Sequence, residues 1–142
     1  MKMSGEDAII ATNQPVFAAF GNPLLDIIVS DEDGQIVDKF ELKKDIAQEV
    51  DTHGLGLFEV ATSKDREDIE YSGGGCALNT MRVFQWLSGV PGDSMFLGGL
   101  GTDTSGNMLQ SLVEKDGVRT SFARHTTLPT GKFKTVPPSI HP

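Results

Sequence analysis

Apolar and polar positions divide the first third of the chain into short segments. Residues 16–20 and 24–29 are mostly apolar, and apolar runs of this length are typical of buried strands. Gly21-Asn22-Pro23 separates the two runs, as a turn would. Asp33-Gly34 is a hairpin signal, and residues 35–42 resume as a strand. This part of the chain is therefore predicted to be β structure.

The middle of the chain changes its period. Weak helical signals at residues 45–50 and 57–64 precede a short strand at 68–72, which leads into three glycines. From Ala77 onward, apolar residues recur at helical spacing until Gly89-Val90-Pro91-Gly92 stops the pattern. We expect a largely buried helix here. Its apolar residues are Leu78, Met81, Val83, Phe84, Trp86 and Leu87.

The last third alternates strand and helix. Asp103 or Thr104 is placed to cap a helix that Gly117 ends. The strands expected around this helix cover residues 94–99, 118–124 and 132–136. Strand, glycine loop, helix, strand, loop, helix and strand in this order predict an α/β fold with parallel strands. We expect a flexible N-terminus at 1–15, a folded region at 16–136 and an irregular tail at 137–142 with three prolines.

Composition narrows the class of protein. A length of 142 residues, 38% of them hydrophobic, fits one domain or part of a larger one. A formal charge of -8 without a basic run argues against binding to nucleic acid or to an anionic membrane. The single cysteine excludes an internal disulfide and fits a reducing compartment. Without a secretory h-region or an apolar stretch of about 18–20 residues, we predict a soluble, cytoplasmic protein, with the nucleus as a second location.

Metal binding is not predicted. His53, His125 and His141 share no metal-ligand spacing, and they are interpreted as surface residues.

The stretch Tyr-Ser-Gly-Gly-Gly-Cys-Ala-Leu-Asn-Thr at residues 71–80 is the strongest candidate for chemistry. It matches neither a P-loop nor the dinucleotide fingerprint, because Leu78 stands where the third glycine belongs. Cys76 at a helix start is open to two interpretations, a reactive thiol or a small buried residue, and the absence of a local histidine favours burial.

The glycines themselves leave two interpretations open. They form either a tight strand-to-helix turn or a loop where a ligand lies against the backbone, with Asn79 one turn inside the helix. Asp26 favours the second, because it is a lone acid in Leu-Leu-Asp-Ile-Ile. A carboxylate among apolar residues needs partners, and two adjacent hydroxyls, as on a ribose, would supply them. A solvent-facing Asp26 remains the simpler alternative.

Several motifs together resemble a known family. Gly-Asn-Pro-Leu-Leu-Asp at 21–26 resembles the opening motif of eukaryotic adenosine kinases, which belong to the ribokinase-like carbohydrate kinases. The glycine stretch is similar to that family's di-glycine segment. Further matches follow in the same order as in the family, and the resemblance covers residues 17–131. These matches are Val-Phe-Gln-Trp-Leu at 83–87, Phe-Leu-Gly-Gly-Leu-Gly-Thr-Asp at 96–103 and Pro-Thr-Gly at 129–131.

The resemblance implies a ribokinase-like fold with a parallel sheet core and a small β lid, and transfer of the ATP γ-phosphate to adenosine with Mg²⁺. By matching position, Asp26 would bind the ribose 2′- and 3′-hydroxyls and Gly74 would be the hinge of the lid. The other residues that would contact the nucleoside are Asn22, Leu24, Gly75, Cys76 and Asn79. Cys76 replaces a usual serine, and Leu78 a usual glutamine.

The sequence also departs from the family. After Gly131 it does not continue in the family pattern, and no Gly-x-Gly-Asp, the family's anion hole and catalytic base, occurs in it. We therefore expect a truncated form that lacks the catalytic half, with no catalytic residue and most ATP-binding residues missing. The alternatives are a non-catalytic nucleoside-binding chain, a chain that self-associates through unpaired sheet edges, a misfolded fragment, and a kinase of another sugar.

Overall fold

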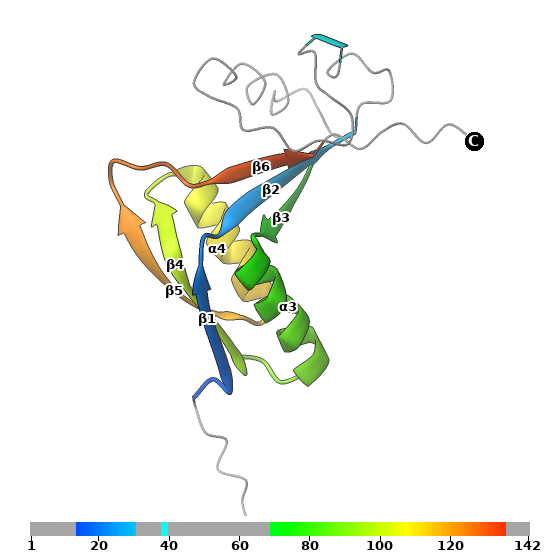
Figure 1. Cartoon of the computed structure of the whole chain (residues 1–142), viewed down its shortest axis with the longest axis vertical. Helices are drawn as coiled ribbons and strands as arrows, with labels where there is room; N and C mark the ends of the chain where they lie inside the picture. The colour runs from blue at the N-terminus through cyan, green and yellow to red at the C-terminus, as the bar shows by residue number, and fades with distance from the viewer. Residues whose placement is uncertain (1–13, 31–37, 40–68, 136–142) are drawn as a thin grey trace, which may run out of the picture.

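A computed structural model describes residues 14–30, 38–39 and 69–135 of the chain. These residues form two three-stranded sheets and two helices that follow the third strand (Figure 1). The strands are β1 (Phe17–Gly21), β2 (Leu24–Val29), β3 (Ile69–Gly74), β4 (Ser94–Gly101), β5 (Arg119–His125) and β6 (Lys132–Thr135). The helices are α3 (Cys76–Ser88) and α4 (Thr104–Lys115).

The first sheet is parallel and has the order β1-β4-β5. Helix α3 leads into β4, and α4 connects β4 to β5, so that each helix packs against the strands it joins. Both helices lie on the same side of this sheet (Figure 1), as expected when successive crossovers of one hand move across a sheet in one direction. This arrangement confirms the predicted α/β class with parallel strands.

The second sheet is mixed and has the order β3-β2-β6. Strand β2 pairs antiparallel with β3 and parallel with β6. Only one face of β2 is buried, because Leu25, Ile27 and Val29 alternate with half-buried residues. The family resemblance implied a small β sheet beside the parallel core, and this mixed sheet stands in that place.

One apolar core joins both sheets to the helices. Gly73 on β3 lies so close to α4 that an added Cβ would come within 3.1 Å of Val113 and 3.5 Å of Leu109. The second sheet therefore packs directly on α4, and any side chain at this glycine would push them apart. The buried apolar residues are Leu25, Ile27, Val29, Leu78, Met81, Phe96, Leu100, Leu109, Val113 and Val118.

A buried amide secures the end of α3. Gln85 is 4% exposed, and its Nε2 donates to the Val90 carbonyl at 2.6 Å. Its Oε1 accepts from the Ser94 amide at 3.1 Å and from the Ser94 hydroxyl at 2.8 Å. One side chain thus joins the helix, the turn after it and the start of β4. Because every polar atom is paired, its burial is tolerated.

The burial predicted for two segments was wrong. Val83, Trp86 and Leu87 on α3 are 55%, 79% and 70% exposed, because the sheet covers only the face of Leu78 and Met81. The apolar run at 16–20 is also exposed, with Phe20 at 85%, because β1 is the edge strand of its sheet among the described residues.

The remaining differences concern the segment between β2 and β3. Residues 38–39 are helical and not part of a strand, in keeping with the low strand preference of Asp and Lys. The rest of the strand expected at 35–42, the turn at 33–34 and the helical signals at 45–50 and 57–64 lie outside the described residues.

Replacing Gln85 tests the buried amide. We expect Gln85→Leu to lower the free energy of unfolding by about 1–3 kcal/mol, because the buried Ser94 amide and hydroxyl would lose the oxygen that accepts from them. Urea unfolding followed by circular dichroism measures the change, with Ser111→Ala on the exposed side of α4 as the control. Equal midpoints for both variants and the unsubstituted chain would contradict this role.

Candidate functional site

An open pocket lies where the parallel strands end. The chain leaves β1, β4 and β5 on the same edge of the sheet, which is where open α/β sheets place their ligands. The start of β2 and the residue before β6 complete the wall, so both sheets contribute to a pocket of about 260 Å³. Its lining residues are Asn22, Pro23, Leu24, Gly99, Leu100, Gly101, His125, Leu128, Pro129 and Gly131.

The Asp26 carboxylate lies directly against the backbone of Gly74. Both carboxylate oxygens occupy the space where a Cβ of residue 74 would project. The β2–β3 register places Leu24 opposite Gly74 and Asp26 opposite Ser72, which brings the acid to the end of β3. Only glycine fits at position 74 with this carboxylate in place. The lone acid and the triple glycine are therefore neighbours in space.

Gly75 is the turn between β3 and α3. Its φ of 101° lies in a region that glycine adopts more easily than other residues. A Cβ here would overlap the Asn22 carbonyl oxygen. As the N-cap residue, Gly75 has no side chain to bind the free amides of the first helical turn. The loop after β1 and the start of α3 are thereby held in backbone contact.

The other predicted residues lie around this contact. Leu24 is half-buried and Asn22 exposed, and both line the pocket. Asn79 is exposed on the first turns of α3. Cys76 is exposed as well, so the predicted burial of this thiol was wrong. It is the first residue of the helix, and Leu78 and Met81 fill the core instead. Contact of these residues with a nucleoside stays a prediction.

Asp26 is held between two opposing electrostatic effects. Burial raises the pKa of Asp26 above its ordinary value of 3.8, and the positive charge of Arg82 on α3 lowers it. Burial is the larger effect, because a carboxylate loses hydration when it is enclosed. Asp26 is half-buried, and no described residue forms a direct ion pair with it.

Asp103 and Thr130 form a hydrogen-bond network with nearby backbone amides, one of which belongs to the pocket residue Gly101. The Asp103 carboxylate caps α4 by accepting from the Gly106 amide at 2.8 Å. It also accepts from the Thr130 amide at 2.9 Å and the Thr130 hydroxyl at 2.7 Å. The same hydroxyl oxygen accepts from the Gly101 amide at 3.0 Å. The loop after β4 and the loop before β6 are thus fixed to each other.

Sequence reasoning missed the pocket wall contributed by β4 and β5. Leu100, His125 and Leu128 line it, although none was a candidate. His125 is exposed, as its interpretation as a surface residue required. The rule that ligands bind at the carboxyl ends of parallel strands would have pointed to the ends of β4 and β5.

Two features are absent from the described part of the chain. It contains no group of three His, Cys, Asp or Glu side chains arranged to hold a metal ion. None of its helices has the length and apolar character needed to cross a membrane.

The sequence profile of pfkB family carbohydrate kinases matches residues 42–136. The chain belongs to this family. The match includes the glycine stretch, α3, β4, α4, β5 and β6, which together form most of the described structure.

Relatives within the family are adenosine kinases. The chain is 37% identical over 112 residues to the adenosine kinase of Dictyostelium discoideum, covering 78% of this chain and 32% of that protein. It is 29% identical over 116 residues to an adenosine kinase of Arabidopsis thaliana, covering 82% and 33%. The chain therefore spans about a third of the length of these relatives.

Solved structures agree with this family. The adenosine kinase of Schistosoma mansoni in complex with adenosine superposes with a TM-score of 0.71 at 28% identity, covering 85% of this chain and 35% of that one. Ribokinase of Giardia lamblia, at 16% identity and a TM-score of 0.55, shares the fold over 85% of this chain and 31% of its own. The ribokinase-like fold predicted from the sequence is confirmed.

The hydrogen-bond network of Asp103 and Thr130 predicts that the stability of the fold depends on pH. Burial raises the pKa of Asp103, but hydrogen bonds from Thr130 and Gly106 outweigh it and hold the pKa below 3.8. A lowered folded-state pKa means that the stabilisation is present above 3.8 and is lost as the pH falls below it. We expect Asp103→Asn to cost about 1–3 kcal/mol at neutral pH, and less at pH values below 3.8.

Urea unfolding of Asp103→Asn, Thr130→Val and the double variant measures this coupling. The double variant should cost less than the sum of the single variants, because the two side chains share their interaction. If the losses of unfolding free energy are additive, or if the loss for Asp103→Asn does not change with pH, the hydrogen bonds between Asp103 and Thr130 do not stabilise the fold.

Proposed function

We propose that this chain forms the nucleoside-binding part of an adenosine kinase, an enzyme that transfers the γ-phosphoryl group of ATP to the 5′-hydroxyl of adenosine. Family membership supports the phosphotransferase class. The names of the relatives support adenosine as the substrate, as does the adenosine bound to the Schistosoma mansoni enzyme.

The observation that carries the proposal is the contact between Asp26 and Gly74. An ionised carboxylate only accepts hydrogen bonds, and its two oxygens match the two hydroxyls of a ribose. Because Gly74 has no side chain, the carboxylate can lie directly against the main chain. Asn22 and Leu24 line the pocket, whereas Asp26 and Gly74 are not among its lining residues; a nucleoside held by Asp26 would extend toward it past Leu24, two residues away on β2.

We assign substrate binding, and not the transfer step, to the residues of this chain. A carbohydrate kinase implies ATP, and Mg²⁺ accompanies phosphoryl transfer in such enzymes. The described residues offer no acidic cluster for that ion, and the sequence contains no Gly-x-Gly-Asp. The groups present therefore fit a bound nucleoside better than a bound ATP–Mg²⁺. Cytoplasmic location remains a prediction.

Calorimetric titration with adenosine tests the proposal. We expect saturable binding, and we expect Asp26→Asn to weaken it roughly tenfold to a hundredfold, the range for loss of a hydrogen bond to a charged group. The substitution keeps the size of the side chain, but it removes the negative charge and one of the two oxygens that would accept the hydroxyls. Binding of 2′,3′-dideoxyadenosine should be weak and insensitive to the same change.

Asp93→Asn is the matched control, because it removes one negative charge at the opposite end of β4. Ribose and inosine titrated in parallel distinguish a nucleoside site from a site for another sugar. Absence of saturable heat with every one of these ligands would refute nucleoside binding by this chain.

Association between copies of the chain is a second candidate role, and the exposed apolar surface favours it. Strand β1 is at an edge of its sheet within the described residues, and Phe17 and Phe20 on it are 48% and 85% exposed. Trp86 on α3 adds an apolar ring at 79% exposure. An open strand edge beside apolar side chains is a template for pairing with an identical strand.

Sedimentation velocity over a range of concentrations tests this association. We expect dimers or larger species to form as concentration rises, and we expect Trp86→Glu to shift the distribution toward monomer because it places a charge in the apolar surface. Lys115→Glu is the control, because Lys115 is an exposed residue on α4 and the variant introduces the same side chain there. Monomer at all concentrations, or an equal shift in both variants, would contradict association through this surface.

A further inference from the structure

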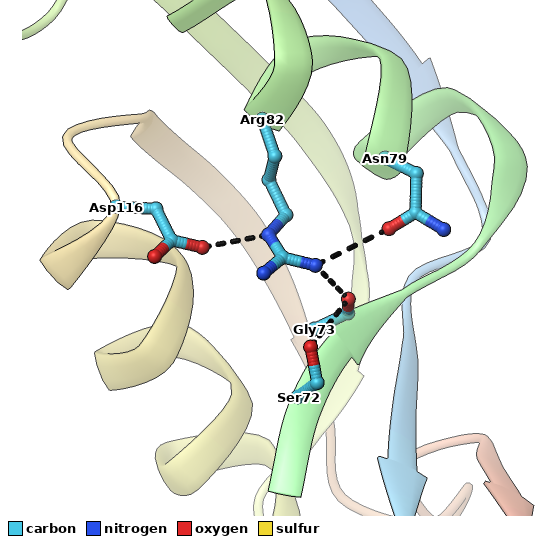
Figure 2. A network of polar contacts seen from close by, with 5 residues as sticks. All are labelled: Ser72, Gly73, Asn79, Arg82 and Asp116. Carbon is cyan, nitrogen blue, oxygen red and sulfur yellow. Dashed lines mark hydrogen bonds and ion pairs between the residues drawn. The ribbon is translucent and has the colours of Figure 1, made fainter. Parts of the chain in front are cut away.

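Arg82 links three parts of the fold that surround the glycine stretch. It lies one turn after Asn79 on α3, and its side chain is 29% exposed (Figure 2). Its Nη1 donates to the Gly73 carbonyl at 2.5 Å and to the Asn79 Oδ1 at 3.4 Å. Its Nε donates to Asp116 Oδ2 at 2.6 Å, just after the end of α4. A planar guanidinium suits this role because its donors point in fixed directions.

The bond to Gly73 acts on the backbone that touches Asp26. The Gly73 carbonyl and the Gly74 amide belong to the same planar peptide group. Fixing the carbonyl therefore fixes the direction of the Gly74 amide and the position of the backbone against the carboxylate. Neither glycine has a side chain to do this, and free rotation of glycine is the largest of any residue.

The bond to Asn79 selects the orientation of its amide group. An Asn side chain has one accepting oxygen and one donating nitrogen. Because the oxygen accepts from Arg82, the nitrogen faces away from the guanidinium (Figure 2). Asn79 is thereby set as a hydrogen-bond donor toward its exposed side.

Arg82 also supplies the positive charge that acts on Asp26. The other charged groups near this acid are placed differently. On β3, Glu70 lies on the same face of the strand two residues from Ser72, the partner of Asp26. On β6, Lys132 and Lys134 flank its partner Phe133 and alternate to the opposite face. Helix α3 thus contributes the one cation, within the described residues, that favours the ionised form of Asp26.

We propose that Arg82 is a positioning residue for the nucleoside site, which fixes the Gly73–Gly74 peptide and the Asn79 amide and holds the site ready for a vicinal diol. Asp116 in turn fixes the guanidinium from α4. The inference rests on the proposed function for its ligand, and on the contacts in Figure 2 for its geometry.

The first test needs no ligand. In the unbound chain, we expect Arg82→Gln to raise the pKa of Asp26 as followed by the carboxyl ¹³C resonance, because the burial effect would act unopposed. We expect the Asn79 side-chain amide resonances to broaden or shift as well. Arg82→Lys keeps the charge but not the fork, so it should restore the pKa of Asp26 without restoring the Asn79 signals.

The second test uses adenosine. Arg82→Gln should weaken adenosine binding roughly tenfold to a hundredfold, as for loss of a charge-assisted hydrogen bond, and more at pH 5 than at pH 8. Lys115→Gln, which removes a positive charge from exposed α4, should leave the affinity unchanged. Binding of 2′,3′-dideoxyadenosine should respond less than binding of adenosine.

The outcomes separate the two proposals. If the unsubstituted chain does not bind adenosine, the proposed function fails, while the ligand-free spectra still decide the role of Arg82. If the chain binds adenosine and Arg82→Gln binds it equally well at both pH values, Arg82 does not position the site. An unchanged pKa of Asp26 together with unchanged Asn79 signals in Arg82→Gln overturns the inference without reference to any ligand.

Discussion

The space beside the α-carbon of residue 74 is occupied by the carboxylate of Asp26, and the rest of the site depends on that overlap. It requires glycine at 74, because any side chain would displace the acid. It also brings the end of β3 next to β2, from which the chain turns at Gly75 into α3. The backbone contact between Gly75 and Asn22 then joins this turn to the end of β1. The two sheets therefore meet at glycines that allow close backbone contact.

Such a meeting point has an electrostatic cost that the surrounding residues reduce. A half-buried carboxylate loses hydration, and Arg82 compensates part of this loss by its charge. The guanidinium is itself tied to Asp116. Before α4, both carboxylate oxygens of Asp103 accept hydrogen bonds from Thr130 and Gly106. One acid is thus paired within the fold, whereas Asp26, under the proposed function, accepts hydrogen bonds from the nucleoside.

Local patterns predicted the elements well and their burial less well. The strand at 24–29 has the predicted bounds, and Asp103 caps α4 as expected, because these depend on neighbours in sequence. The proximity of Asp26 and the glycines followed from chemical complementarity and the family resemblance. The exposure of Trp86 and Phe20 could not be predicted, because a period shows that a helix or strand is apolar but not which neighbours cover it. The role of Arg82 could not be predicted for the same reason, because its partners Gly73 and Asp116 are 9 and 34 residues away in the sequence.

One face of the parallel sheet exposes apolar side chains within the described residues. Parallel sheets are found almost only with both faces covered, yet α3 and α4 lie on one side of the β1-β4-β5 sheet (Figure 1). Phe20 at 85% and Leu97 at 37% exposure remain uncovered within the described residues. A layer that covers them would also fix β1, which carries Asn22 at its end. Because Asn22 touches Gly75 through its backbone, motion of an uncovered β1 would reach the glycine turn. The geometry of the proposed nucleoside site therefore depends on how the far face of this sheet is covered.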